Sequence, residues 1–282
     1  MLRRPAYLAG QWYPSQPNAC REAIAAHARS ARPEQGEWRG LIGPHAGWYF
    51  SGDAAARTYA WLARARPDAD LVVVFGSHRG PEGPNTVFRG DVWETPLGDL
   101  DNHRALADGV AQALPLQDEP VTPRHADNGV ELHLPFVRYF FPQARLLMLG
   151  VAAAPAAVHV GEQVATLSAA HARNPVFVGS TDLTHYGPNY GFEPHGRGAA
   201  AVGWVRREND RRFIDAVLAG DEGAVLRHGV ETHGACCPGA AAATLAAVRT
   251  WGAREKPKLV DHYLSCDVQP NSSFVGYAGI IL

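Results

Sequence analysis

Thirteen histidines in a chain of 282 residues are the side chains best able to carry chemistry, because imidazole binds transition metals and transfers protons near neutral pH. Two of them, His45 and His78, closely follow short apolar runs and have glycines nearby, in residues 43–47 and 76–80. Glycines allow the backbone to approach a ligand closely. Two imidazoles presented in this way could give one divalent ion two neutral nitrogen ligands.

A third polar cluster, residues 180–186, holds Asp182 and His185. One interpretation is a carboxylate that orients an imidazole for proton transfer. The alternative is a capped turn, in which Asp182 accepts hydrogen bonds from backbone N–H groups. The two residues alone do not decide between these interpretations.

A fourth cluster, residues 232–237, contains His233 and ends in the adjacent Cys236 and Cys237, just before a predicted helix. The helix dipole could lower the pKa of these thiols, whereas small residues buried at a tight turn are the plainer interpretation. No nucleophile elbow, phosphate-binding loop or dinucleotide fingerprint occurs, which removes the commonest other enzyme families.

The elements that must position these clusters alternate between strands and helices. This alternation predicts a single-domain α/β sandwich over residues 1–282, with a central mostly parallel or mixed sheet flanked by helices. Ligands bind beyond the carboxyl ends of the strands in such folds, where three of the clusters fall. Expected strands cover residues 40–43, 70–75, 145–150, 175–179 and 274–282, and expected helices cover 51–62, 102–114, 156–173, 202–218, 221–228 and 239–251.

Composition excludes several classes of protein. The chain has 26 Lys and Arg against 28 Asp and Glu, so it has no basic field for nucleic acid and no basic block for a membrane surface. It shows neither a membrane span nor a secretory signal, and we expect a cytoplasmic protein. Its four cysteines are too few for a disulfide framework, so reduced thiols are expected.

Taken in order, these motifs resemble the Memo family, which is found in bacteria beside radical-SAM and AMMECR-type partners. The likeness covers nearly the whole chain and implies a fold related to the class III extradiol ring-cleavage dioxygenases. An interaction with such a partner and a homo-oligomeric state stay open. The segments that carry the resemblance are residues 9–14, 44–52, 76–78, 93–98, 131–136, 180–186 and 275–277.

The resemblance also implies roles for individual residues. His45 and His78 match the two histidine metal ligands, and Asp182 and His185 match the acid and base positions of the same pocket. The third ligand is a Cys followed by Gly in typical Memo proteins and a Glu in the dioxygenases. Here His233 followed by glycine matches that position without a gap.

Two departures from the family's pattern affect the pocket. The first is His233 in place of the family's Cys, because using Cys236 or Cys237 as the third ligand would require a shift in the alignment. Residues 127–129 read Asp-Asn-Gly where the family usually has Glu-His-Ser, so a polar wall of the pocket is expected to differ. Substrates of relatives therefore do not transfer directly.

The predicted chemistry is that of a non-haem Fe(II) dioxygenase acting on a small catechol- or aminophenol-like substrate with dioxygen. Three imidazoles leave the ion's charge uncompensated and favour an anionic substrate. His185 would act as acid or base, with Asp182 setting its tautomer. The expected pocket residues are Trp12, Trp48, Tyr49, Asn128, Tyr186 and Cys236.

Three alternatives stay open. The same imidazoles suit Zn²⁺ with an activated water, as in a hydrolase or lyase. A set without thiolate makes Cu(I) a weaker candidate, since soft sulfur ligands select that ion. Finally, the pocket could bind a metal or a phosphopeptide without turnover, as the resemblance to animal Memo proteins implies.

Overall fold

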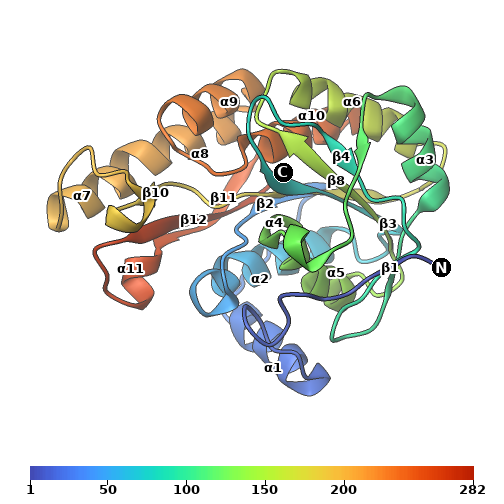
Figure 1. Ribbon diagram of the computed structural model, residues 1–282, viewed down its shortest axis with the longest axis horizontal. Coiled ribbons are helices and arrows are strands. Elements are labelled where there is room, and N and C mark those ends of the chain that lie inside the picture. The colour runs from blue at the N-terminus through green and yellow to red at the C-terminus, as the bar shows by residue number, and fades with distance from the viewer.

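A nine-stranded mixed sheet forms the centre of the molecule, and the computed structural model describes all 282 residues (Figure 1). In spatial order its strands are β10 (His185–Tyr186), β12 (Phe274–Ile281), β2 (Gly40–Gly43), β9 (Pro175–Ser180), β3 (Leu71–Arg79), β8 (Arg145–Ala152), β4 (Thr86–Val87) and β7 (Gln117–Asp118), and β11 (Lys258–Leu264) pairs with β12.

The four central strands β2, β9, β3 and β8 are mutually parallel, whereas β12 runs antiparallel to β2 and β4 runs antiparallel to β8. The central strands are apolar runs buried on both faces, as parallel strands covered by helices must be. The structure therefore confirms the predicted α/β architecture with a mixed, mostly parallel sheet.

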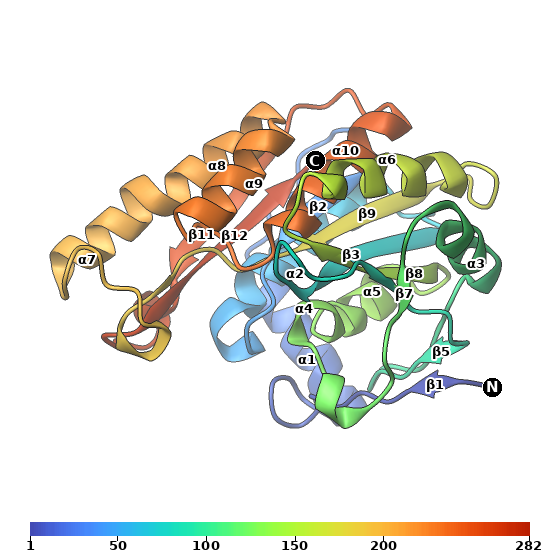
Figure 2. The ribbon, with the colours of Figure 1, turned by 45° about the horizontal axis from the view of Figure 1, so that its top comes forward.

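Helices cover both faces of this sheet (Figure 2). Alternate side chains of one strand point to opposite faces, so Val73 and Phe75 of β3 belong to one core while Val72 and Val74 belong to the other. The first face carries α3 (Arg104–Ala113), α6 (Ala156–Ser168), α8 (Asp210–Ala219), α9 (Glu222–Glu231) and α10 (Pro238–Trp251), and the second carries α1 (Pro17–Ala28), α2 (Trp48–Ala65), α4 (Asn128–Glu131) and α5 (Leu134–Phe140).

Helices α6 and α10 pack unusually close together. A Cβ atom added to Gly161 of α6 would lie 2.1 Å from the carbonyl oxygen of Ala243 in α10, so only glycine fits there. The facing part of α10 is a run of buried alanines, residues 240–243. This close contact fixes α10, and with it the turn at the start of α10.

The remaining elements are short and lie outside the central layers. The hairpin of β11 and β12 extends away from the body with α7 and α11 beside it (Figure 1). The short elements outside the central layers are β1 (Arg3–Arg4), β5 (Val92–Trp93) and β6 (Leu100–Asp101), which form a three-stranded sheet, α7 (Ala199–Trp204), a π-helical turn (Val205–Asn209), α11 (Ser265–Val268) and the 3₁₀ turns Pro123–His125 and Pro188–Tyr190. None of the helices in the molecule combines the length and the apolar character needed to span a membrane.

Two sequence-based details differ from the structure. The helix expected over residues 202–218 is divided by the π-helical turn between α7 and α8. The helix expected from residue 102 begins at Arg104, and the His103 side chain caps it by accepting a hydrogen bond from the Leu106 N–H. Asn102 is buried and donates its side-chain amide hydrogens to the carbonyls of Phe88 and Gly90.

Candidate metal centre

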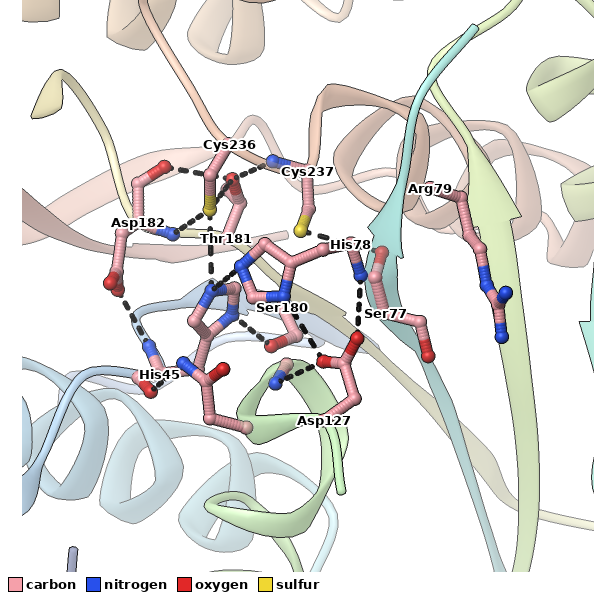
Figure 3. A network of polar contacts seen from close by, with 12 residues as sticks. His45, Ser77, His78, Arg79, Asp127, Ser180, Thr181, Asp182, Cys236 and Cys237 are labelled. Carbon is pink, nitrogen blue, oxygen red and sulfur yellow. Dashed lines mark hydrogen bonds and ion pairs between the residues drawn. The ribbon is translucent and has the colours of Figure 1, made fainter. Parts of the chain in front are cut away.

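Four side chains gather beyond the carboxyl ends of the parallel strands, namely His45, His78, Cys236 and Cys237, and their donor atoms all lie within 4.8 Å of one another (Figure 3). Nε2 of His45 is 3.2 Å from Nε2 of His78 and 3.2 Å from Sγ of Cys236. Two nitrogens bound at about 2.0–2.1 Å to one tetrahedral ion lie about 3.3 Å apart. The three atoms therefore have the spacing of ligands to a common metal ion.

The first ligand, His45, follows β2 and is buried. Its Nδ1 is 2.7 Å from Oγ of Ser180 at the end of β9, and its backbone N–H donates to Oδ1 of Asp182 at 2.7 Å. Burial alone would lower the pKa of His45, but the negative charges of Cys236 and Asp182 outweigh burial and raise it. Because one ring nitrogen is engaged with Ser180, the other is presented to the centre.

The second ligand, His78, lies at the end of β3, just after Ser77, whose φ of 66° is left-handed. Its Nδ1 is 3.1 Å from Oδ1 of Asp127, and its backbone N–H donates to Oδ2 of the same carboxylate at 2.9 Å. The backbone N–H of Gly129 also donates to Asp127, at 2.7 Å, so this carboxylate caps α4 as well.

Asp127 and His78 form a charged pair in the metal-free protein. Burial would raise the pKa of Asp127, but its hydrogen bonds with His78 outweigh burial and lower it to about 2. Burial would lower the pKa of His78, but its contacts with Asp127 and Cys236 raise it to about 11. In the sequence, residues 127–129 stand out only as a departure from the family's pattern. An Asp before a helix start, the one signal present, predicts a cap and not a partner of His78.

The adjacent thiols Cys236 and Cys237 stand at the start of α10 and differ in state. Burial would raise the pKa of Cys236, but contacts with Cys237 and the two imidazoles lower it well below its ordinary value. The contact with Cys236, together with burial, raises the pKa of Cys237, and its Sγ donates to the Ser77 carbonyl at 3.5 Å. Cys236 is therefore the thiol of the pair that ionises more readily, and Cys237 is held by the end of β3.

Hydrogen bonds tie this turn to the loop after β9. The backbone N–H of Cys236 donates to the Asp182 carbonyl at 3.1 Å, and the Asp182 N–H donates to Sγ of Cys236 at 3.3 Å. The N–H of Cys237 donates to Oγ1 of Thr181 at 3.0 Å. The ends of β2, β3 and β9 and the turn before α10 are thereby joined in one network (Figure 3).

His233, expected to be the third ligand, lies outside the group. Its side chain is exposed, its backbone has a left-handed φ of 52°, and its ring contacts Phe192 with centroids 4.7 Å apart. The turn formed at this residue points His233 away and brings Cys236, three residues later, beside His45. Cys236 replaces His233 in the candidate ligand set. The signal available in the sequence was a pair of thiols directly before a helix.

The group borders a cavity of about 630 Å³ whose lining includes His78, Asn128, Asp182 and His185. Nδ1 of His185 is 3.1 Å from the Leu183 carbonyl oxygen. A carbonyl can only accept, so Nδ1 carries the proton and Nε2 is free to accept one. His185 also packs edge-on against Tyr190, with ring centroids 4.9 Å apart.

The sequence predicted that Asp182 sets the tautomer of His185, but the structure places a different group beside the His185 ring. Oδ1 of Asp182 accepts the backbone N–H of His45, and the Leu183 carbonyl takes the place beside the His185 ring. Burial raises the pKa of Asp182. The carboxylate nevertheless lines the same cavity as His185.

The expected pocket residues divide into two groups. Asn128 and Trp12 line the cavity, and Cys236 lines a smaller neighbouring cavity of about 330 Å³ that also touches His185. Trp48, Tyr49 and Tyr186 line neither cavity. Trp48 is 3% exposed and packs against Phe136, Tyr186 is buried against Phe274, and Tyr49 is 67% exposed beside Phe50. The aromatic walls are instead Trp12, Phe50, Tyr190 and Tyr277.

Comparison with known proteins gives full-length matches. Residues 4–281 match the profile of the family described as Memo-like protein. A MEMO1 family protein of Methanopyrus kandleri is 31% identical over 298 residues, which cover 100% of this chain and 99% of the relative. A MEMO1 family protein of Methanococcoides burtonii is 32% identical over 285 residues, which cover 100% of both chains.

A solved structure, that of an uncharacterized protein from Escherichia coli K12, shares the fold. It matches with a TM-score of 0.51 and 16% sequence identity, over 86% of this chain and 99% of the other. At this identity the likeness concerns the fold alone.

Proposed function

Because the chain belongs to the family of Memo-like proteins, we propose that His45, His78 and Cys236 form the metal centre of a dioxygenase acting on a small hydroxylated aromatic. The observation that supports this proposal is the spacing of three donor atoms beside a cavity. Nε2 of His45 lies 3.2 Å from both Nε2 of His78 and Sγ of Cys236. The cavity is also lined by the imidazole of His185, which can accept a proton.

The donor set fits a divalent ion. Both imidazoles have their second ring nitrogen beside an oxygen of Ser180 or Asp127, as metal-bound histidines usually do. Fe(II) held by two histidines and one cysteine would supply open positions for a substrate oxygen and dioxygen. The thiolate of Cys236 neutralises one positive charge of such an ion, so the substrate needs to contribute less negative charge than at a three-histidine site.

His185 is the acid–base group of the proposed reaction. Its Nδ1–H is held by the Leu183 carbonyl, so Nε2 is the nitrogen available to accept a proton from a phenolic hydroxyl in the cavity that His185 lines. Tyr190 packs against the ring and limits its movement. Asp182 acts through His45, whose backbone it holds at 2.7 Å.

The test is anaerobic loading with Fe(II), followed by measurement of oxygen uptake with catechols and aminophenols. We expect one iron per chain and oxygen uptake that depends on substrate. His185→Ala is expected to retain iron and lose at least about 100-fold in rate. The matched control is His233→Ala, which removes an imidazole that lines the neighbouring cavity. This variant is expected to retain both the bound iron and the rate of oxygen uptake. Bound iron without oxygen uptake across the whole panel would favour a metal-binding module without turnover.

A zinc-dependent hydrolase or lyase is the second candidate, and the observation that favours it is the mixed nitrogen and sulfur donor set. Zinc binds imidazole nitrogen and cysteine sulfur, and the three candidates His45, His78 and Cys236 would leave a fourth position for an activated water. Elemental analysis of protein purified from unsupplemented cells would distinguish the candidates. Zinc bound at one ion per chain, with hydrolytic activity in the absence of oxygen, would overturn the dioxygenase proposal.

A further inference from the structure

The walls of the large cavity contain neither lysine nor arginine. Among their 17 residues the single acidic side chain is that of Asp182, and the two imidazoles belong to His78 and His185. The outer wall is polar but uncharged. Its polar residues are the carboxamides Gln11, Asn189, Gln269 and Asn271 and the hydroxyls of Ser265 and Ser273. A further carboxamide, Asn128, donates to the His45 carbonyl at 3.1 Å and so belongs to the metal end.

Three of these carboxamides are free to bind a ligand. The side chains of Gln11, Asn189 and Gln269 form no hydrogen bond within the protein, so each offers two N–H donors and one carbonyl acceptor. Asn271 is fixed, because its Oδ1 accepts the backbone N–H of Ser273 at 2.9 Å. The outer wall therefore combines a fixed rim with donors and acceptors that can adapt.

The outer wall also offers no counterion. An anionic substituent at this wall would lose part of its hydration and find no lysine or arginine to pair with. Such desolvation without a partner is unfavourable, whereas a neutral amide or hydroxyl can exchange its water for the carboxamides.

The cavity is also larger than a bare catechol needs. A volume of about 630 Å³ lies in the range of pockets for whole small molecules, and four aromatic side chains form part of its walls. A substrate with its hydroxylated ring at the metal end would extend a substituent toward Gln269 and Asn189.

We propose that the substrate is an aromatic whose outer substituent is uncharged and forms several hydrogen bonds, such as an amide or a polyol, and that aromatics bearing a carboxylate or phosphate are rejected. This inference rests on the proposed function for the placement of the hydroxylated ring. The uncharged wall of carboxamides selects the outer substituent of the substrate.

The test compares 3,4-dihydroxybenzamide with 3,4-dihydroxybenzoate, which have nearly the same shape and differ in charge. Binding is measured by anaerobic calorimetry on zinc-loaded wild-type protein, so that turnover does not occur. We expect the dissociation constant of the benzamide to be at least about tenfold lower. Equal or tighter binding of the benzoate would overturn this inference and leave the proposed function intact.

A charge variant tests whether the outer wall is the cause. Gln269→Arg places a cation on the exposed rim, and we expect benzoate binding to tighten by about tenfold while benzamide binding changes less than about twofold. Gln35→Arg makes the same charge change at an exposed residue outside this cavity and is expected to change neither. An unchanged preference in Gln269→Arg would overturn the assignment to the wall. Failure of both probes to bind protein that holds one zinc per chain would overturn the proposed function and this inference together.

Discussion

The candidate ligands come from two regions that are built differently. His45 and His78 follow the carboxyl ends of the parallel strands β2 and β3, and each ring is held by an oxygen from a neighbouring segment. Cys236 comes from the turn before α10, where the left-handed residue His233 points outward. Strand register fixes a ligand at a strand end, whereas the conformation of a turn decides which of several donors faces the centre.

The largest expected effect comes from replacing Cys236, and a second variant replaces His233 in the same turn. Cys236→Ser replaces the thiolate with a weaker, neutral ligand, and we expect metal affinity to fall on the order of 100-fold or more. His233→Ala removes an exposed imidazole and is expected to leave the metal affinity unchanged. Chelator competition followed by elemental analysis measures both. Loss of metal in His233→Ala with retention in Cys236→Ser would reverse our assignment of the turn.

The same contrast explains how much of the fold could be predicted. The apolar runs at residues 70–75, 145–150 and 175–179 are found as β3, β8 and β9, because parallel strands buried on both faces leave a continuous apolar signal. The half-buried β11 was not predicted. Two-residue strands such as β4 and β7 were also missed, since β4 depends on pairing with β8 and β7 on pairing with β4, and each carries too few residues for a pattern.

The site could be predicted in part for the same reason. His45, His78 and Asp182 were placed near one another because each follows a parallel strand, and the structure brings them together. The position of Cys236 depends on a left-handed φ at His233, a histidine where glycine is the usual residue. No local pattern reports that conformation, so aligning residue types without a gap selected the wrong donor.

A second test concerns the strand-end region alone. Asp127→Asn keeps the shape of the side chain but removes the charge that holds His78, and we expect metal affinity to fall about 10- to 100-fold. Asp118→Asn, an exposed carboxylate paired with Arg89, is the matched control and is expected to change affinity little. If both variants bind metal as wild type does, His78 is positioned by its strand and not by Asp127.

A third test addresses the link between the two regions. Thr181→Val keeps the side-chain volume but removes the Oγ1 that accepts the buried N–H of Cys237. We expect the free energy of unfolding to fall by about 1–3 kcal/mol in urea titrations of the metal-free protein. Thr250→Val, at an exposed position of α10, is the control for the same substitution. A loss equal to that of the control would mean that α10 is held by helix packing alone.

The smallest effect is expected at Cys237, the second thiol of the turn. Its Sγ donates to the Ser77 carbonyl, and a hydroxyl can make the same hydrogen bond. Cys237→Ser is therefore expected to change metal affinity by less than about threefold in the same chelator competition. A loss comparable with that of Cys236→Ser would show that both thiols bind the ion. Four protein ligands would then close the site, and the positions that the proposed reaction needs for substrate and dioxygen would be filled.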